Sequence, residues 1–393
     1  MNTAEIVELE DRYQVPTYKK FPMALVRGEG AFVWDEERRR YLDFYGGHCV
    51  AILGHCPPTV TKAIHKQSET LLFYSNLVYS DIRAEAAQRV AQAAPEGLQH
   101  VFFCNSGTEA NETALKLARK VTGKPGVLAT IGGFHGRTLG SLAVTWGDKY
   151  HEGYEAVLPK TTYVPFGDLE ATAATLAADD QIAALILEPI QSIAGITQGD
   201  AAYYQGLRAL CDQHGVMLIF DEVQTGVYRT GTFSISEAYG MKPDMITLAK
   251  SLGAGVPVGA VLVSDAISAT VKIEDQGTTF GGGMLAMAAV NATLATIQSE
   301  NLMANAGKIF AHIRADLAEY PVTLRGRGCL IGIEMDTPVA PMVAALRKHG
   351  VIVGGSANPN VMRVMPPLNT TPSDIAVFVQ AFDAAYREIT VAA

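Results

Sequence analysis

Charge is scarce in this 393-residue sequence, and no long block of one sign occurs. Charged residues make up 18% of the chain, and 40 acids against 31 bases give a formal net charge of -9. Nucleic acids and anionic membranes attract basic surfaces, so we expect neither as a partner. Hydrophobic residues make up 48% of the chain, which is typical of a large filled core. The length suits two domains, or one large domain with a smaller one.

The sequence also lacks a signal peptide, a membrane-spanning run and paired cysteines, and these absences bear on where the protein works in the cell. The first residues, MNTAEIVELEDRY, lack the basic start and apolar centre of a signal peptide. No uncharged apolar run reaches the ~18 residues that cross a bilayer. The five cysteines are scattered without CxxC spacing, so neither a disulfide framework nor a zinc site is indicated. We therefore expect a reduced, cytoplasmic protein that binds no metal.

One pattern repeats between about residues 98 and 265: a short apolar run, a turn of small or polar residues, and a segment of helical period. The apolar runs are HVFFC (100–104), VLAT (127–130), IAALILE (182–188), VMLIFDE (216–222), MITLAK (245–250) and VGAVLVS (258–264). Helical periods follow at 108–121 and at 203–214, where Gly215 ends the second. Continuous rather than alternating hydrophobicity predicts strands covered on both faces, and hence an α/β fold with a mostly parallel sheet.

The pattern of apolar residues changes after Gly283. Long helical stretches (284–320) precede short apolar runs at 330–335 and 362–366, which indicates a smaller α+β domain. FVWDEERRRYLDF, near the N-terminus, resembles a hairpin, and we expect it to pack near that smaller domain. The sequence therefore predicts a large domain over 51–283 and a small domain built from 1–50 and 284–393.

Ionisable residues follow the apolar runs at Glu188, Asp221 and Lys250. Ligands of an open parallel sheet bind beyond the carboxyl ends of its strands, so these residues should border a pocket. Lys250, in ITLAKSLGAG, has mostly apolar neighbours. It is either a lysine that extends its charge to solvent or a desolvated amine that can attack an aldehyde. Asp221 either caps the next turn or meets a cationic or N–H partner. Glu222 should be solvated or structural.

The segment CNSGTEANETALKLAR offers an anion site. Ser106, Gly107 and Thr108 follow a predicted strand and open a helix, where backbone N–H groups and the helix dipole converge. The same residues also fit a simple N-cap, with Glu109 as the reciprocal member of a capping box. Both interpretations can hold together. A phosphate site, a buried acid and a desolvated lysine at one edge of a sheet together fit pyridoxal 5'-phosphate.

Several ordered motifs carry a resemblance to a known family. NSGTEANETALKLAR, GGFHGRTLGSL, LEPIQ, IFDEVQTGVYRTG, TLAKSLGAGVPVGAV and GTTFGGGMLAMAA resemble, in order and spacing, the class III pyridoxal-phosphate-dependent aminotransferases. The nearest branch is similar to the acetylornithine/ornithine aminotransferases. The resemblance covers the chain from YLDF (41–44) to RVMPPLNTT (363–371). It implies the fold of the PLP-dependent transferases (fold type I), with a large domain around a mostly parallel sheet and a smaller α+β domain.

The resemblance also implies roles for individual residues. Lys250 should be the Schiff-base lysine, and Asp221 should pair with the pyridinium nitrogen. The other cofactor-binding positions would be Ser106, Gly107, Thr108, Phe134, Glu188, Val223, Gln224 and Thr279. Within this set, Phe134 and Val223 face the two sides of the ring, and Gln224 reaches the ring hydroxyl. Thr279 would reach the cofactor of a neighbouring subunit, which implies a homodimer with shared active sites. Arg137, Arg363 and Thr278 would bind the substrate.

The implied activity transfers an amino group from a small-molecule donor to a 2-oxo acid, with 2-oxoglutarate expected. Related ω-aminotransferases carry a glutamate after EPIQ that pairs with the second carboxylate-binding arginine, whereas this chain has Ile193 there. We therefore expect an altered specificity, in favour of donors that present a carboxylate to Arg363. A decarboxylase or aminomutase of the same fold, and a non-catalytic PLP-binding protein, are the alternatives. A nicotinamide dehydrogenase is disfavoured, because the glycines of SLGAGVPVGA follow a lysine and are spaced as GxGxxxG.

Overall fold

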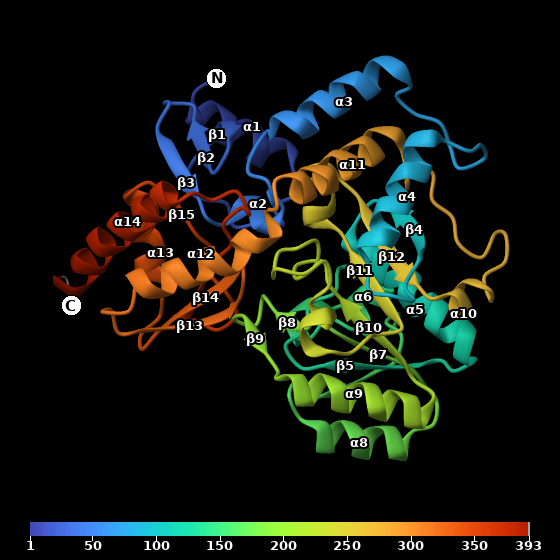
Figure 1. Cartoon of the computed structure of the whole chain (residues 1–393). Helices are drawn as coiled ribbons and strands as arrows, with labels where there is room; N and C mark the ends of the chain where they lie inside the picture. The colour runs from blue at the N-terminus through green and yellow to red at the C-terminus, as the bar shows by residue number, and fades with distance from the viewer. Residues whose placement is uncertain (392–393) are drawn as a thin grey trace.

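The largest sheet of the computed structural model, which describes residues 1–391, has seven strands and lies in the larger part of the molecule, on the right of Figure 1. Its strands, in spatial order, are β4 (His100–Cys104), β12 (Gly259–Val263), β11 (Met245–Leu248), β10 (Met217–Asp221), β7 (Ile182–Leu187), β5 (Gly126–Thr130) and β6 (Thr161–Val164). Strand β12 is antiparallel to both of its neighbours, while the pairs among β11, β10, β7, β5 and β6 are parallel. The predicted α/β fold with a mostly parallel sheet is confirmed.

Both faces of the sheet are covered, as the continuous apolar runs predict. Successive side chains of a strand point to opposite faces. On β10, Ile219 packs in one core with α5 (Gly107–Thr122), while Leu218 and Phe220 pack in the core on the other face. Helix α9 (Ala201–His214) contacts β10, and α8 (Leu169–Ala178) contacts β6 and α9. Helices α5 and α9 thus confirm the two predicted helical segments, and Gly215 ends α9 in the left-handed conformation.

The chain after the sheet forms long helices. The predicted helical stretch 284–320 is divided into α11 (Met284–Ser299) and α12 (Met303–Asp316). Helix α11 packs against α3 (Pro58–Thr70) and α4 (Asp81–Ala93). Shorter elements are α2 (Gly46–Cys49), α6 (Leu139–Ala143), α7 (Asp148–His151), α10 (Asp265–Ser268) and the 3-10 turns η1 (Ile235–Tyr239) and η2 (Lys250–Gly253).

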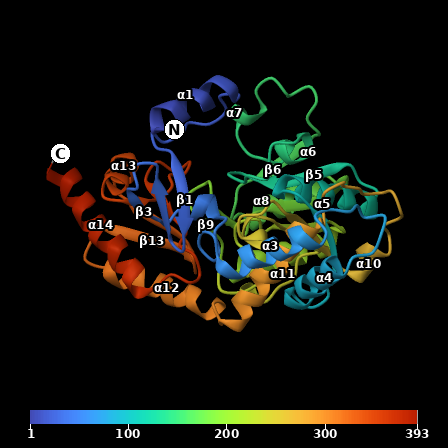
Figure 2. The same cartoon turned by 90° about the horizontal axis from the view of Figure 1, so that it is seen from above.

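The N-terminal strands meet the C-terminal part of the chain (Figures 1 and 2). The hairpin expected from FVWDEERRRYLDF forms from β2 (Phe32–Asp35) and β3 (Arg40–Asp43). Strand β1 (Leu25–Glu29) pairs with β2, and β15 (Val351–Ile352) pairs in parallel with β3. A second, antiparallel sheet holds β13 (Val322–Arg327), β14 (Leu330–Met335) and β16 (Val361–Val364). The division at 50/51 and 283/284 stays a prediction.

The remaining elements complete the described chain. They are α1 (Thr3–Tyr13), α13 (Ala340–Lys348), α14 (Pro372–Val391), and the short pair β8 (Ile190–Gln191) and β9 (Thr197–Gln198). Helix α13 packs against α14, and α14 also contacts α12 and β3. Among the helices of residues 1–391, none combines the length and the apolar character needed to cross a membrane.

Candidate active site

The strands of the central sheet open, at their carboxyl ends, into a cavity of about 450 Å3. Ser106 follows β4, Glu188 follows β7, Asp221 ends β10 and Lys250 follows β11. The cavity brings together most of the residues that the sequence singles out: Ser106, Gly107, Thr108, Phe134, Arg137, Glu188, Asp221, Val223, Gln224 and Lys250. This is the place where ligands of open α/β sheets bind.

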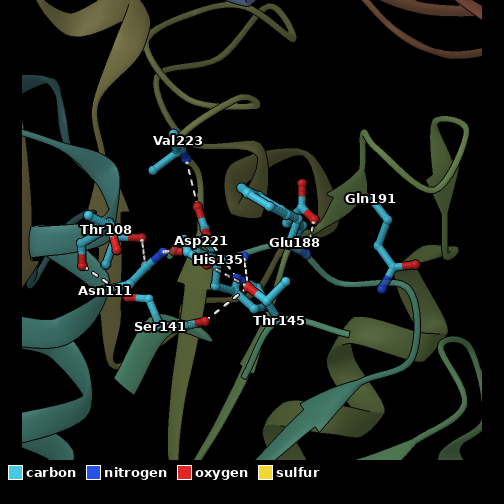
Figure 3. Close-up of polar contacts among 12 residues, drawn as sticks. Thr108, Asn111, His135, Ser141, Thr145, Glu188, Gln191, Asp221 and Val223 are labelled. Carbon is cyan, nitrogen blue, oxygen red and sulfur yellow. Dashed lines mark hydrogen bonds and ion pairs between the residues drawn. The ribbon is translucent and has the colours of Figure 1, made fainter. Parts of the chain in front are cut away.

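Asp221 is buried and fixed by several donors (Figure 3). Its Oδ2 atom accepts a hydrogen bond from Asn111 Nδ2 at 2.8 Å and lies 2.8 Å from Nδ1 of His135. Its Oδ1 atom accepts from the backbone N–H of Val223 at 3.1 Å. Asn111 in turn accepts a hydrogen bond from the Thr247 hydroxyl. A carboxylate held this firmly at the edge of a cavity can receive a cationic ligand group with little reorganisation.

Lys250 is held in an uncommon backbone conformation at the start of η2. Its φ angle of 41° lies in the left-handed region, and such residues cost about 1–3 kcal/mol, which is typical of functional sites. Burial lowers the pKa of its ammonium, while the nearby Cys49, Asp221 and Glu188 oppose this shift. Burial therefore increases the share of neutral amine, which is the nucleophilic and basic form.

Helix α5 presents its N-terminus to the cavity. Gly107 and Thr108 are its first residues, and backbone N–H groups in a first helical turn have no acceptor within the helix. The Ser106 hydroxyl accepts from Glu109 N at 3.3 Å, which confirms the N-cap. Glu109 in turn accepts from Asn105 N (2.7 Å) and from the Ser106 hydroxyl (3.1 Å), so its side chain bonds the N–H before the cap residue instead of closing a capping box. Because the Ser106 proton is directed to Glu109, the free donors toward an anion are the backbone N–H groups of Gly107 and Thr108.

Gly107 and Val223 lie in close contact on one side of the cavity. A Cβ atom on Gly107 would stand 2.8 Å from Val223 Cγ2, so only glycine fits without displacement. Phe134 and Gln224 also line the cavity. Gln224 is 6% exposed, and its Oε1 atom has no hydrogen-bond partner within residues 1–391. A flat ring with a polar substituent would fill this space and satisfy that atom.

Glu188 joins two loops beneath the cavity. Its Oε1 atom accepts a hydrogen bond from Phe134 N at 2.8 Å, and its Oε2 atom accepts from Ser192 N at 3.3 Å. Burial, followed by the nearby Asp221 charge, raises the pKa of Glu188 to about 7. Glu188, the acid that ends LILE, therefore fixes the backbone of Phe134, and the charge of Glu188 depends on pH near neutrality.

The residues present fit pyridoxal 5'-phosphate: a buried amine, a buried carboxylate, the N-terminus of a long helix and a narrow cleft beside Gly107. The family described as "Aminotransferase class-III" matches residues 13–386. The chain belongs to the class III aminotransferases. It uses pyridoxal 5'-phosphate, and it transfers an amino group from a donor to a 2-oxo acid.

Curated relatives agree with this assignment. An acetylornithine aminotransferase from Methanopyrus kandleri is 44% identical, with 92% of this chain and 93% of that protein covered. One from Bacillus subtilis is 39% identical, with 94% and 96% covered. Among solved structures, an ornithine aminotransferase from Toxoplasma gondii has a TM-score of 0.91 at 28% identity, with 99% and 96% covered. An (S)-enantioselective omega-transaminase from Thermomicrobium roseum also has a TM-score of 0.91, at 29% identity with 99% of each chain covered.

Arg363 of the aminotransferase lies on β16 and is 5% exposed. It is absent from the residues that line the cavity, but its charge acts to lower the pKa of Lys250, so the two cations are neighbours. Its guanidinium donates to the Ser192 hydroxyl (3.3 Å), the Tyr45 hydroxyl (2.9 Å) and the Gly355 carbonyl (2.6 Å). All three acceptors are neutral.

The remaining predicted substrate residues lie in different settings. Arg137 lines the cavity, with its guanidinium carbon 4.9 Å from the ring centroid of Tyr150 and 5.8 Å from that of Phe134. Thr278 and Thr279 are not among the cavity-lining residues. The Thr278 hydroxyl accepts from Asn105 Nδ2 at 3.1 Å, and Thr279 is exposed.

Glu222 takes the second of the two roles that the sequence allows. It is 1% exposed and therefore not solvated. Its carboxylate accepts hydrogen bonds from Ile235 N (2.9 Å) and the Thr225 hydroxyl (3.1 Å), and burial raises its pKa to about 7. Its contacts are those of a structural residue, the other role that the sequence allows.

Sequence reasoning missed the residues that hold Asp221 and Arg363. Asn111 lies one turn into α5, and His135 follows Phe134 inside the quoted GGFHGRT motif, yet neither was singled out. A polar residue one turn after a predicted anion site, on the apolar face of its helix, was the available signal for Asn111. Tyr45 offered no comparable signal, because its contact with Arg363 joins residues 318 positions apart.

Proposed function

We propose that the aminotransferase takes its amino group from donors that present a carboxylate to Arg363, with 2-oxoglutarate as the acceptor. Such a specificity would differ from that of relatives named acetylornithine aminotransferase. The observation that carries the proposal is the set of neutral partners of Arg363, namely Ser192, Tyr45 and Gly355. Among residues 1–391 no carboxylate forms an ion pair with this buried guanidinium, which can therefore attract an incoming one, and bidentate geometry favours arginine for this task.

The cofactor, when bound, supplies an electron sink for the carbon that carries the amino group. Lys250 is proposed as the residue that holds the cofactor and then moves a proton at the reacting carbon. Its lowered pKa supports this role, because a neutral amine can accept that proton. Asp221 is proposed as the partner of the ring nitrogen, a role supported by its fixed position at the end of β10.

The other site residues are proposed to bind and orient. Gly107 and Thr108 would hold the phosphate through backbone N–H groups, with Ser106 shaping the turn through Glu109. Phe134 and Val223 would flank the ring, Gln224 would meet its hydroxyl, and Glu188 would keep Phe134 in place. Arg137 would bind a second carboxylate. Thr278, which contacts Asn105 beside the anion site, would border the substrate.

We also propose a homodimer with shared active sites in the cytoplasm. Thr279 is exposed and so is free to reach the cofactor of a second subunit. Large apolar side chains near it and in the segment before α4 are exposed as well: Leu72, Leu77, Tyr79, Ile273 and Phe280. Exposed apolar patches of this kind mark protein interfaces.

A half-reaction screen tests the donor. Each candidate amine is added to the holoenzyme without acceptor, and the change in the cofactor absorption band is followed. We expect α-amino acids other than glutamate, which is the product formed from 2-oxoglutarate, to react faster than N-acetylornithine, ornithine and 4-aminobutyrate. A clear preference for an ω-amine would refute the proposed specificity, and carbon dioxide release or turnover without an acceptor would indicate the decarboxylase or aminomutase.

A further inference from the structure

Arg363 has a definite capacity for one more ligand. A guanidinium carries five N–H donors, and its Nε, Nη1 and Nη2 atoms each donate once, to Gly355, Ser192 and Tyr45. This leaves one N–H on each terminal nitrogen. A pair of N–H groups on the two terminal nitrogens is what a carboxylate needs for bidentate binding.

Tyr45 connects Arg363 to a histidine. Its hydroxyl accepts from Arg363 Nη2 and makes a short hydrogen bond with Nδ1 of His48. The His48 ring stands edge-on to the Tyr45 ring, with centroids 5.0 Å apart. The guanidinium carbon of Arg363 lies 5.5 Å from the Tyr45 ring centroid. Tyr45 is therefore held between the two side chains, with its oxygen directed at Arg363.

An unusual backbone presents His48. Gly46, Gly47, His48 and Cys49 are consecutive residues with positive φ angles of 58°, 54°, 68° and 65°. For residues with a Cβ atom this conformation costs about 1–2 kcal/mol each. The backbone conformation alone would favour glycine at all four positions. A histidine kept at such a position, with its ring nitrogen on a tyrosine hydroxyl, points to a role for that ring.

His48 acts as a neutral group. Part of the residue is exposed, but burial of its ring, together with the charges of Lys250 and Arg363, lowers its pKa to about 4. Near neutral pH, its Nδ1 atom can therefore accept the Tyr45 proton. The Tyr45 oxygen then keeps its lone pairs for Arg363, and His48 itself adds no charge beside the guanidinium.

We propose that Tyr45 and His48 are positioning residues that fix the guanidinium of Arg363 for a substrate carboxylate. These two residues, here called the neutral brace, take the place of a charged partner. A charged partner would have to be displaced by each substrate, whereas a neutral brace stays in contact. This inference rests on the proposed function, in which Arg363 receives that carboxylate. Tyr45 acts through Arg363, and His48 acts through Tyr45.

Glutarate binding to the holoenzyme tests the brace, because glutarate has two carboxylates and neither an amino nor an oxo group. Tyr45→Phe removes only the hydroxyl and should raise the glutarate Kd about tenfold, the cost of one hydrogen bond to a charged group. The KM for the acceptor should rise similarly, with kcat at saturation changed less than twofold. Tyr13→Phe, at a tyrosine that is 72% exposed, is the matched control and should leave the Kd unchanged.

His48 is tested with two variants that tolerate a positive φ angle. His48→Gly removes the ring without strain and should weaken glutarate binding about fivefold. His48→Asn tolerates the same backbone and offers an amide near the place of Nδ1, so it should restore most of the affinity. A purely structural role would not distinguish these variants by their effect on glutarate. Equal glutarate Kd values in wild type, Tyr45→Phe and His48→Gly would overturn the brace.

The outcomes also separate the brace from the proposed function. Preferred reaction with ω-amines, together with weaker glutarate binding in Tyr45→Phe, would refute the donor specificity and keep the brace. A wild-type holoenzyme that does not bind glutarate would overturn both.

Discussion

Replacing Gly107 by alanine should weaken cofactor binding strongly while leaving the fold intact. The new Cβ atom would lie 2.8 Å from Val223 Cγ2 and 3.1 Å from Cγ1, whereas ordinary contacts of a Cβ atom span 3.4–4 Å. Val223 must therefore move by several tenths of an ångström. Its backbone N–H is tied to Asp221, so the easiest movement is that of its side chain into the cavity.

The size of the effect on the cofactor Kd depends on whether the Val223 side chain has room to move. Without cofactor, the Val223 side chain can enter the open cavity, so the apoprotein should lose little stability. With cofactor, the space is filled, and overpacking of about 1–3 kcal/mol corresponds to a Kd about 5- to 150-fold higher. Gly107 is the first residue of α5 and has no positive φ angle, so alanine brings no backbone strain and keeps the N–H.

The assay is titration of the apoenzyme with pyridoxal 5'-phosphate, followed by absorbance, alongside thermal unfolding of the apoenzyme. Gly307→Ala, on the exposed side of α12 with no atom within 4 Å of the new Cβ, is the matched control. If Gly107→Ala binds the cofactor as tightly as the wild type, the cleft does not hold the ring where we place it. A loss of apoprotein stability with unchanged affinity would refute the reasoning as well.

Further predictions concern the charged groups of the site. Lys250→Ala should abolish turnover and remove the visible band of the bound cofactor, and an unchanged spectrum would exclude the assigned role of Lys250. Ser192→Asp would place a carboxylate beside Arg363 and should raise the KM for the 2-oxo acid at least about tenfold, whereas Ser192→Ala, which loses only the hydrogen bond, should have a smaller effect. The pKa of Glu188 is raised from 4.5 to about 7 in the folded protein. As pH rises, this carboxyl group therefore loses its proton in the unfolded chain before it does so in the folded protein. The stability of the fold falls as pH rises from about 4.5 to about 7. Between pH 5 and 8 the wild-type apoprotein should lose about 2–3 kcal/mol of unfolding free energy that Glu188→Gln does not lose, and denaturant titrations with parallel trends would contradict this.

The strands of the central sheet could be predicted because both of their faces are buried, which leaves a continuous apolar run in the sequence. Strand β6 was not predicted, because TTYV is short and rich in hydroxyl groups. Three of its four residues are only partly buried. The antiparallel direction of β12 has no signature in composition, because a run such as GAVLV is compatible with either direction. Topology depends on connections that local patterns do not encode.

Site residues at strand ends could be predicted for the same reason that the strands could. Asp221 and Lys250 interrupt apolar runs, and each interruption lies at the same edge of the sheet. The residues that hold these groups are different. His135 touches Asp221 across 86 positions of sequence, and its neighbours Phe134 and Gly136 follow no helical or strand period. Long-range hydrogen bonds of this kind become visible only once the chain is folded.

Ser192 and Ile193, adjacent in the segment SIAG after β8, have different surroundings. Ser192 contacts Arg363, whereas Ile193 lines a neighbouring cavity of about 360 Å3 that also contains Phe134, Trp146 and Tyr150. The backbone carbonyl of Ile193 accepts from Ala357 N at 2.7 Å, which fixes this orientation. Electrostatic neutrality beside the arginine therefore depends on position 192 as well as on position 193. We expect position 192 to govern whether Arg363 is free for a carboxylate, and position 193 to govern the shape and polarity of the space beyond Phe134, so the two can be changed independently.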